Sequence, residues 1–254
     1  MRADLHTPLG LSLYRYGFCS PEVRLLPQLL LPGDIFIDGG ANIGVFSLIG
    51  ALAVGPTGRV LACEPAPGTM ALLTANAGEN QLAALELHEV ALSDCPGRAR
   101  FTVFDAGSGL ASFAPEHAAG RQVDVSVTTL DALTEDLDGP VSVVKLDIEG
   151  AEAKALRGAR ALIARHAPIF LMEIEPEHLA RQDSSIRDIR AVLEPEGYAA
   201  YAITPAARLA RLTGDWQPPD AQAPNVVLAP PSRTARLSGI VASADSPGGA
   251  LSTG

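Results

Sequence analysis

The sequence predicts an α/β protein whose β-sheet is mostly parallel and has helices on both faces. Short apolar runs that are typical of buried strands alternate with segments of helical composition. A glycine-rich turn links the first apolar run to the helical segment after it, and an acidic residue ends the second run. Repeated strand–helix units give parallel strands, because each helix carries the chain back to the end of the sheet where the previous strand began.

The chain is expected to contain an N-terminal cap, an α/β domain and a disordered tail, over residues 1–33, 34–232 and 233–254. The tail is rich in serine, alanine, glycine and proline, a composition typical of disorder. Strands are expected at residues 34–37, 59–65, 85–90, 141–147, 169–174, 198–203 and 225–228, of which the last two form an antiparallel pair. Helices are expected at residues 22–31, 45–52, 67–80, 151–165 and 184–193.

Residues 94–130 interrupt this alternation and are expected to form a β insert. Polar and apolar side chains alternate over residues 98–104 and 121–127, which predicts two strands. The segment between them is expected to be a mobile lid over the carboxyl edge of the sheet, because long loops in compact domains are often lids. A solvated connection without a function is the alternative.

The composition argues against some classes of partner. The 254 residues carry a formal net charge of −10, whereas nucleic-acid-binding proteins usually present a basic face. No apolar run approaches the ~20 residues of a membrane span, and the N-terminus lacks the apolar core of a signal peptide. The three cysteines are too widely spaced for a disulfide framework or a zinc site. We therefore expect a cytoplasmic protein without nucleic-acid or membrane partners, and the oligomeric state stays open.

The segment after the first strand has the pattern of a nucleotide-type ligand site. Asp38, Gly40, Asn42 and Gly44 form the pattern D-x-G-x-N-x-G before a helix. Glycine lets the backbone approach a ligand closely, and a helix N-terminus offers free N–H groups. A dinucleotide site has G-x-G-x-x-G, so Asn42 argues against a nicotinamide-dependent oxidoreductase. Asp38 suits a cationic or hydroxyl-bearing ligand such as S-adenosylmethionine, which carries a sulfonium, an ammonium and a ribose diol.

Glu64 strengthens this prediction. It follows the second apolar run, and an acid at the end of that strand accepts hydrogen bonds from ribose hydroxyls in doubly wound folds. A turn that only connects a strand to a helix would account for Gly39 and Gly40 but not for Glu64. The sequence therefore favours S-adenosylmethionine as the cofactor.

A second group of charged residues lies where the fourth strand ends. Lys145 and Asp147 share one face of this strand, and Asp147 lies at the carboxyl end, where open α/β sheets bind ligands. Asp147 and Glu149 are candidates for a general base that accepts the proton of an attacking hydroxyl group. The alternative for Glu149 and Glu152 is a favourable interaction with the N-terminus of the next helix. Lys145 is expected to pair with Glu173 on the adjacent strand.

No metal site is predicted. Asp147, Glu149 and Glu173 offer oxygen ligands that suit Mg²⁺ or Ca²⁺, but they lack the dense spacing of a dedicated metal-binding loop. No pairing at ligand spacing occurs among the histidines His88, His117, His166 and His178.

Several short motifs occur in an order that resembles the FkbM family of S-adenosylmethionine-dependent methyltransferases. The motifs are D-G-G-A-N-I-G at 38–44, C-E-P at 63–65, A-L-S-D at 91–94, V-T-T-L-D at 127–131, K-L-D-I-E-G-A-E at 145–152 and L-R-G-A at 156–159. Each is common among Rossmann-like proteins, whereas G-A-N-I-G combined with K-x-D-x-E-G-x-E is specific. The resemblance covers residues 32–175, with a weaker match through Asn225.

The resemblance implies a Rossmann-like, seven-strand methyltransferase sheet and mainly O-methylation. Implied acceptors are hydroxyl groups of small molecules, sugars and secondary metabolites, or modified peptides. The alternatives are N-methylation of a peptide or amide side chain, and a non-catalytic protein that binds S-adenosylmethionine. Gly39 is a departure from the family, which more often has a small aliphatic residue there.

The resemblance also implies a role for each candidate residue. Asp38, Gly40 and Asn42 belong to the turn that binds the methionine part of the cofactor, and Gly44 completes the glycine pattern. Glu64 is implied to bind the ribose, and Ser93 and Asp94 to lie at the adenine end. The acidic residues Asp147 and Glu149 are implied to lie near the transferred methyl group.

Overall fold

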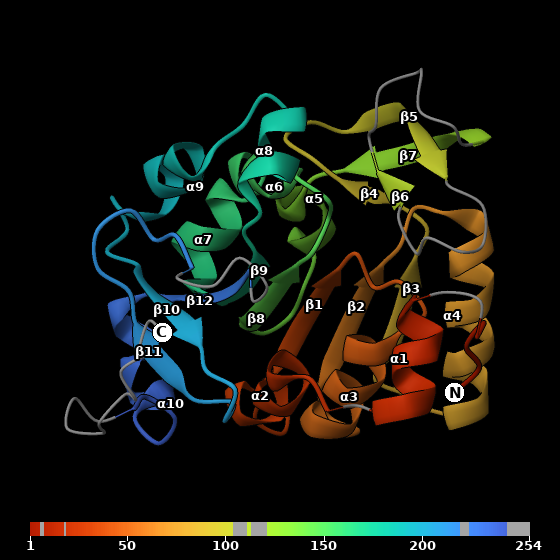
Figure 1. Ribbon diagram of the computed structural model, residues 1–254, viewed down its shortest axis with the longest axis horizontal. Helices are drawn as coiled ribbons and strands as arrows, with labels where there is room; N and C mark the ends of the chain where they lie inside the picture. The colour runs from red at the N-terminus through yellow and green to blue at the C-terminus, as the bar shows by residue number, and fades with distance from the viewer. Residues whose placement is uncertain (6–7, 18, 104–110, 113–120, 219–223, 243–254) are drawn as a thin grey trace, which may run out of the picture.

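The computed structural model describes residues 1–5, 8–17, 19–103, 111–112, 121–218 and 224–242. The larger of its two sheets has eight strands in the order β11-β10-β12-β9-β8-β1-β2-β3 (Figure 1). These strands are β1 (Ile35–Gly39), β2 (Arg59–Cys63), β3 (Leu85–His88), β8 (Val141–Leu146), β9 (Ile169–Glu173), β10 (Ala199–Ile203), β11 (Leu209–Arg211) and β12 (Asn225–Ala229).

The direction of the strands confirms a mostly parallel sheet. The neighbours β9, β8, β1, β2 and β3 are all parallel. β12 lies antiparallel to both β9 and β10, so the two late strands pair as predicted. The sheet has one strand more than the seven expected, because β11 pairs antiparallel with β10. With three residues, β11 is too short to give an alternation pattern in the sequence.

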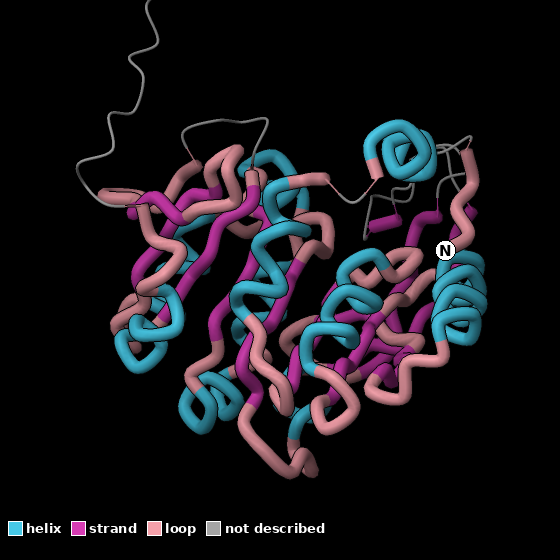
Figure 2. The backbone as a smooth tube through the Cα atoms, turned by 90° about the horizontal axis from the view of Figure 1, so that it is seen from below, coloured by secondary structure: helices cyan, strands magenta, loops and turns pink. Residues whose placement is uncertain are grey.

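Helices pack along the strands of the larger sheet (Figure 2). They are α1 (Pro8–Tyr16), α2 (Pro21–Leu29), α3 (Val45–Val54), α4 (Pro67–Asn80), α5 (Leu130–Thr134), α6 (Glu152–Arg157), α7 (Arg160–His166), α8 (Pro176–Arg181), α9 (Ile186–Leu193) and α10 (Thr234–Leu237), with a short 3₁₀ turn at Pro231–Arg233. Neighbouring residues of β1 face opposite sides. Phe36 belongs to an apolar cluster with Leu25 of α2, and Ile37 to another with Leu156 and Leu162 of α6 and α7.

Two expected elements are divided in the structure. The helix expected over residues 151–165 is two helices, α6 and α7, which are separated at Gly158. A Cβ at Gly158 would lie 2.4 Å from the carbonyl oxygen of Ser93, so the turn packs directly on the segment after β4 (Ala91–Leu92). The strand expected over residues 85–90 ends at His88, and β4 joins the smaller sheet. Both divisions depend on long-range contacts that leave no local signal.

The smaller sheet contains the strands expected in the β insert. Its order is β4-β7-β5-β6, and β5 (Gly97–Val103) pairs antiparallel with β7 (Arg121–Thr128). Figure 1 shows this sheet beyond the carboxyl ends of β1 and β2. The expected lid lies outside the described residues, apart from the two residues of β6 (Ala111–Ser112).

The C-terminal segment is ordered beyond residue 233, where the sequence predicted a disordered tail to begin. The segment contains α10, in which Leu237 is fully buried, and Ile240 is buried beyond it. Arg236 pairs with the carboxylate of Asp34 next to β1. These two buried apolar side chains and the partly buried ion pair outweigh a local composition that is typical of disorder. Residues 243–254 lie outside the described part of the chain.

Leu237 tests this packing. We expect Leu237→Ala to lower the free energy of unfolding by about 2–5 kcal/mol, because a fully buried leucine loses its packing and leaves a cavity. The matched control is Leu52→Ala, since Leu52 is 70% exposed and should change stability by less than about 0.5 kcal/mol. Equal urea-denaturation midpoints for both variants would contradict the packing of α10.

The turn after β1 is tight because the chain after β8 lies against it. Gly40 has a φ of +74°, and a Cβ there would lie 1.9 Å from the carbonyl oxygen of Asp147. At Gly44, with a φ of +97°, a Cβ would lie 2.6 Å from Cδ1 of Leu73. The sequence predicted that these glycines leave room for a ligand. The structure adds a second steric reason, which is close packing against the protein itself, and the role toward a ligand stays a prediction.

Gly40→Ala is therefore expected to destabilise the fold. The left-handed backbone costs a non-glycine residue about 1–2 kcal/mol, and the clash with Asp147 adds about 1–3 kcal/mol. Gly78→Ala is the control, because Gly78 lies in α4 with nothing within 4 Å of an added Cβ. Thermal unfolding of both variants is the measurement. A wild-type melting temperature for Gly40→Ala would show that the turn tolerates the extra methyl group.

Candidate active site

A pocket opens at the carboxyl ends of β1, β2 and β8, next to the smaller sheet. It holds about 630 Å³ of open space, including the solvent at its mouth. The predicted site residues that line it are Gly40, Asn42, Glu64, Asp147 and Glu149. The predicted residues outside the lining are Asp38, Gly44, Ser93 and Asp94.

Glu64 is held in the pocket by two backbone N–H groups. Its Oε2 accepts a hydrogen bond from Asn42 at 3.0 Å, and its Oε1 accepts one from Ala66 at 2.9 Å. Burial raises the pKa of Glu64 to about 7, against the opposite effect of these two hydrogen bonds. Each carboxylate oxygen has a second lone pair. Glu64 can therefore still accept hydrogen bonds from a ligand.

Asp38 is buried beneath the surface of the glycine turn and does not line the pocket. It is fully buried, accepts a hydrogen bond from the hydroxyl of Ser47 at 2.6 Å, and lies 3.4 Å from Nζ of Lys145. Asn42 has a left-handed φ of +51°. Its Oδ1 accepts a hydrogen bond from the N–H of Ile43 at 2.8 Å, and local bonds of this kind let asparagine adopt such a backbone.

Lys145 joins the glycine turn after β1 to the loop after β8 that carries Asp147 and Glu149, the acidic loop. Its Nζ lies 3.4 Å from carboxylate oxygens of both Asp38 and Asp147, and donates to the carbonyl oxygen of Gly40 at 3.2 Å. The prediction that Lys145 pairs with Glu173 is wrong. β8 has two neighbours, and Lys145 is paired toward β1, where Asp38 is in register with it. Burial opposes the charge of Lys145, but the two carboxylates outweigh burial and raise its pKa.

The loop after β8 presents two carboxylates to the pocket. The side chain of Asp147 is 39% exposed. Burial and the charge of Asp147 raise the pKa of Glu149 to about 7. Glu152 is buried and accepts hydrogen bonds from the N–H groups of Ile148 at 2.9 Å and Gly150 at 3.3 Å. Glu152 thus shapes the loop at the start of α6, whereas Glu149 faces the pocket.

Ser93 and Asp94 lie beside the pocket wall. The Ser93 hydroxyl donates to Asp94 at 3.3 Å, and Asp94 pairs with Arg157 of α6 at 3.4 Å. Sequence reasoning missed the apolar residues that line this part of the pocket, which are Val90, Ala91, Leu92 and Phe101. An apolar side chain in a strand looks the same in sequence whether it faces the core or a ligand. The signal for Ala91 and Leu92 is that they belong to the A-L-S-D motif, and Val90 directly precedes it.

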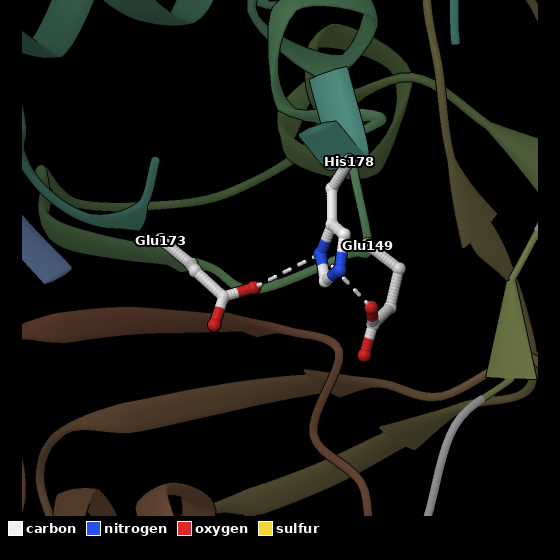
Figure 3. A group of neighbouring side chains, drawn as sticks. All are labelled: Glu149, Glu173 and His178. Atoms are coloured by element: carbon white, nitrogen blue, oxygen red, sulfur yellow. Dashed lines mark ion pairs between the residues drawn. The ribbon is translucent and has the colours of Figure 1, made fainter. Parts of the chain in front are cut away.

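His178 of α8 lies among three carboxylates, of which Figure 3 shows those of Glu149 and Glu173. Its Nδ1 is 3.2 Å from Glu149 and 3.8 Å from Glu173, and its Nε2 is 2.8 Å from Glu175. Burial and the neighbouring carboxylates, Asp147 foremost, raise the pKa of Glu173 far above its usual range. The sequence did not predict His178 as a site residue, because the residues around it come from separate elements.

The sequence matches to known proteins include both the glycine turn after β1 and the acidic loop after β8. The model of the methyltransferase FkbM domain matches residues 38–200. The 31-O-demethyl-FK506 methyltransferase FkbM of Streptomyces tacrolimicus is 30% identical over an alignment of 203 residues that covers 68% of this chain and 75% of that protein. Methyltransferase 1 of Beauveria bassiana is 26% identical over an alignment of 210 residues that covers 74% of this chain and 78% of that protein.

Among solved structures, the O-methyltransferase TomG of Streptomyces achromogenes in complex with S-adenosylmethionine covers 90% of both chains, with 15% identity and a TM-score of 0.49. None of the described helices is long and apolar enough to cross a membrane. The family match includes the glycine turn, Glu64 and the acidic loop after β8. The chain belongs to the FkbM family of methyltransferases, and its cofactor is S-adenosylmethionine.

Proposed function

We propose that this methyltransferase transfers the methyl group of S-adenosylmethionine to a hydroxyl group of a small molecule. The observation that carries the proposal is that Glu64 and the acidic residues Asp147 and Glu149 line one pocket. Glu64 offers hydrogen-bond acceptors for a ribose diol. Asp147 and Glu149 offer carboxylates that can accept the proton of an attacking alcohol.

The residues of the pocket fit the cofactor. The free lone pairs of Glu64 suit the ribose hydroxyls. Gly40 and Asn42 border the space before α3, where the methionine part would lie. The apolar wall of Leu92 and Phe101 suits an adenine ring. In this arrangement the residues that support the pocket without lining it are Asp38, Gly44, Ser93 and Asp94. They would affect cofactor binding through the position of the lining residues.

The chain has to position the acceptor and take up its proton. The bound cofactor supplies an activated methyl group. Alignment of the acceptor oxygen with that methyl group lowers the entropic cost of reaction. Glu149, with a pKa of about 7, suits proton transfer near neutral pH, and Asp147 is the more exposed carboxylate. Lys145 holds Asp147 through its ion pair.

The acceptor class rests on the name of one relative. The protein of Streptomyces tacrolimicus is named for methylation of 31-O-demethyl-FK506, a small molecule. We extend the class, a hydroxyl group of a small molecule, to this chain. Transfer of labelled methyl groups to a panel of hydroxylated small molecules, sugars and modified peptides is the test. Mass spectrometry of the product then separates O-methylation from N-methylation, and transfer to nitrogen alone would refute the proposal.

Glu64→Gln should weaken binding of S-adenosylhomocysteine by about 1.5–3 kcal/mol, because its amide NH₂ would face one of the two backbone N–H donors. In the wild type, affinity should fall as the pH drops through 7 and protonates Glu64. The expected loss is about tenfold between pH 8 and pH 6, and the variant should lack it. Calorimetry measures both.

Glu86→Gln is the matched control for Glu64→Gln. Glu86 pairs with Arg59 on neighbouring strands and does not line the pocket, so its variant should bind like the wild type. A dissociation constant that is unchanged in Glu64→Gln would remove Glu64 from cofactor binding.

Asp147→Asn should lower single-turnover methyl transfer by about 10²–10⁴-fold, the usual contribution of acid–base catalysis, with little change in affinity for S-adenosylhomocysteine. Glu149→Gln should have the same effect or a smaller one. Lys145 keeps Asp38 as a partner in Asp147→Asn, so the turn should persist. Asp136→Asn, at an exposed position before β8, is the control. Near wild-type transfer in both acidic-loop variants would leave these residues a structural role only.

A further inference from the structure

We propose that Glu149, Glu173 and His178 form a binding site for a divalent transition-metal ion such as Mn²⁺ or Zn²⁺ beside the pocket, which it adjoins through Glu149. The three side chains come from the loop after β8, the end of β9 and α8, and converge on one point (Figure 3). The cation site is independent of the proposed methyl acceptor. Its role in the reaction, described below, rests on the proposed function.

The distances suit a common ion. One ligand atom from each side chain lies within 4.8 Å of the others. Nδ1 of His178 is 3.2 Å from Glu149 and 3.8 Å from Glu173. Adjacent ligand atoms that bind one ion at about 2.1 Å lie about 3.0–3.4 Å apart. Small side-chain rotations are therefore enough to bring all three ligand atoms to a shared ion.

The second nitrogen of His178 is oriented as in a metal-bound histidine. Nε2 lies 2.8 Å from the carboxylate of Glu175. Histidine ligands usually donate their other ring N–H to a carboxylate or a carbonyl, which fixes the ring and directs the free lone pair at the ion. With the proton on Nε2, the lone pair of Nδ1 faces Glu149 and Glu173. Glu175 thus acts as a positioning residue for the imidazole.

Nδ1 of His178 is the second, independent sign of a ligand. It is a buried nitrogen without a hydrogen-bond partner, although two carboxylates surround it. A lone pair that faces two carboxylates is repelled by them, so a proton or a metal cation has to lie between them. Buried polar atoms without partners are rare in proteins, and a bound ion is one of the usual reasons.

The backbone brings the ligands together by close packing. A Cβ at Gly150 would lie 2.1 Å from the carbonyl oxygen of His178, so the loop after β8 touches α8 directly. The preceding residue, Glu149, has a left-handed φ of +56°. Strain at a non-glycine residue persists where the surrounding structure enforces it, often at functional sites. This backbone conformation does not by itself indicate a ligand, but it sets the direction in which the side chain of Glu149 leaves the loop.

Local charge also favours a cation. Three carboxylates, those of Glu149, Glu173 and Glu175, lie within 3.8 Å of the ring nitrogens of His178. Lys145 is already paired with Asp147 and Asp38. A divalent ion would compensate two of the remaining carboxylates at once. Imidazole together with carboxylates suits Mn²⁺ or Zn²⁺ better than Ca²⁺, which prefers oxygen ligands alone.

The position of the ion would connect it to catalysis. Glu149 both lines the pocket and belongs to the ligand set. An ion held by these three side chains would supply Lewis-acid chemistry, by which an acceptor hydroxyl bound to it would become more acidic. Glu149 then serves as a ligand, and Asp147 keeps the role of proton acceptor.

The test is a titration of the chelator-treated, full-length protein with Mn²⁺, followed by electron paramagnetic resonance, and with Zn²⁺, followed by calorimetry. We expect one ion per chain. Glu175→Gln removes the hydrogen-bond partner of a ligand and should weaken the affinity for the ion by about 10–100-fold. Glu173→Gln and His178→Asn each remove a ligand and should weaken that affinity at least as much. Near-ultraviolet circular dichroism checks that each variant folds.

Glu177→Gln is the matched control, because Glu177 lies on the same helix with its side chain 88% exposed. Its affinity for the ion should equal that of the wild type. No stoichiometric binding by the wild type, or equal binding by Glu173→Gln and His178→Asn, would refute the site. Binding of S-adenosylhomocysteine is measured separately, so failure of the metal site and failure of the proposed function give different results.

Discussion

The ion pairs of one buried lysine connect the two segments that border the pocket, the turn after β1 and the loop after β8. Lys145 has a side chain that is only 4% exposed, yet it carries a charge that water does not stabilise. Asp38 and Asp147 compensate that charge, and the ring of Phe46 lies 4.9 Å from Nζ. Removal of one member of a buried ion pair typically costs about 3–5 kcal/mol, because the other charge is left alone. The turn after β1 and the loop after β8 are thus energetically linked.

Strand order explains why motifs that are distant in sequence meet at this lysine. β1 has β2 on one side and β8 on the other, so the order of the sheet reverses between β1 and β8. Open α/β sheets bind ligands in the crevice at such a reversal. Asp38 is in register with Lys145 across it, and Gly40 packs on the carbonyl of Asp147 just beyond. The same crevice therefore receives the cofactor turn and the acidic loop.

The sequence predicted the elements whose signals are local. The buried strands, the D-x-G-x-N-x-G turn and the position of Glu64 follow from apolar runs and residue types within a few positions. The choice of partner for Lys145 did not follow, because β8 has two neighbours and only the folded register selects Asp38. The cluster around His178 was also missed. Its members lie on separate elements that meet only after Gly150 packs against α8.

The place of β12 in the sheet has a consequence for the order in which the chain is assembled. β12 lies between β9 and β10, although β10 and β11 precede it in the sequence. During synthesis from the N-terminus, β10 and β11 leave the ribosome before the strand that joins them to the rest of the sheet. An isolated two-stranded hairpin is only marginally stable in water. The half of the sheet that carries the pocket can therefore form first, and the far edge closes when β12 inserts.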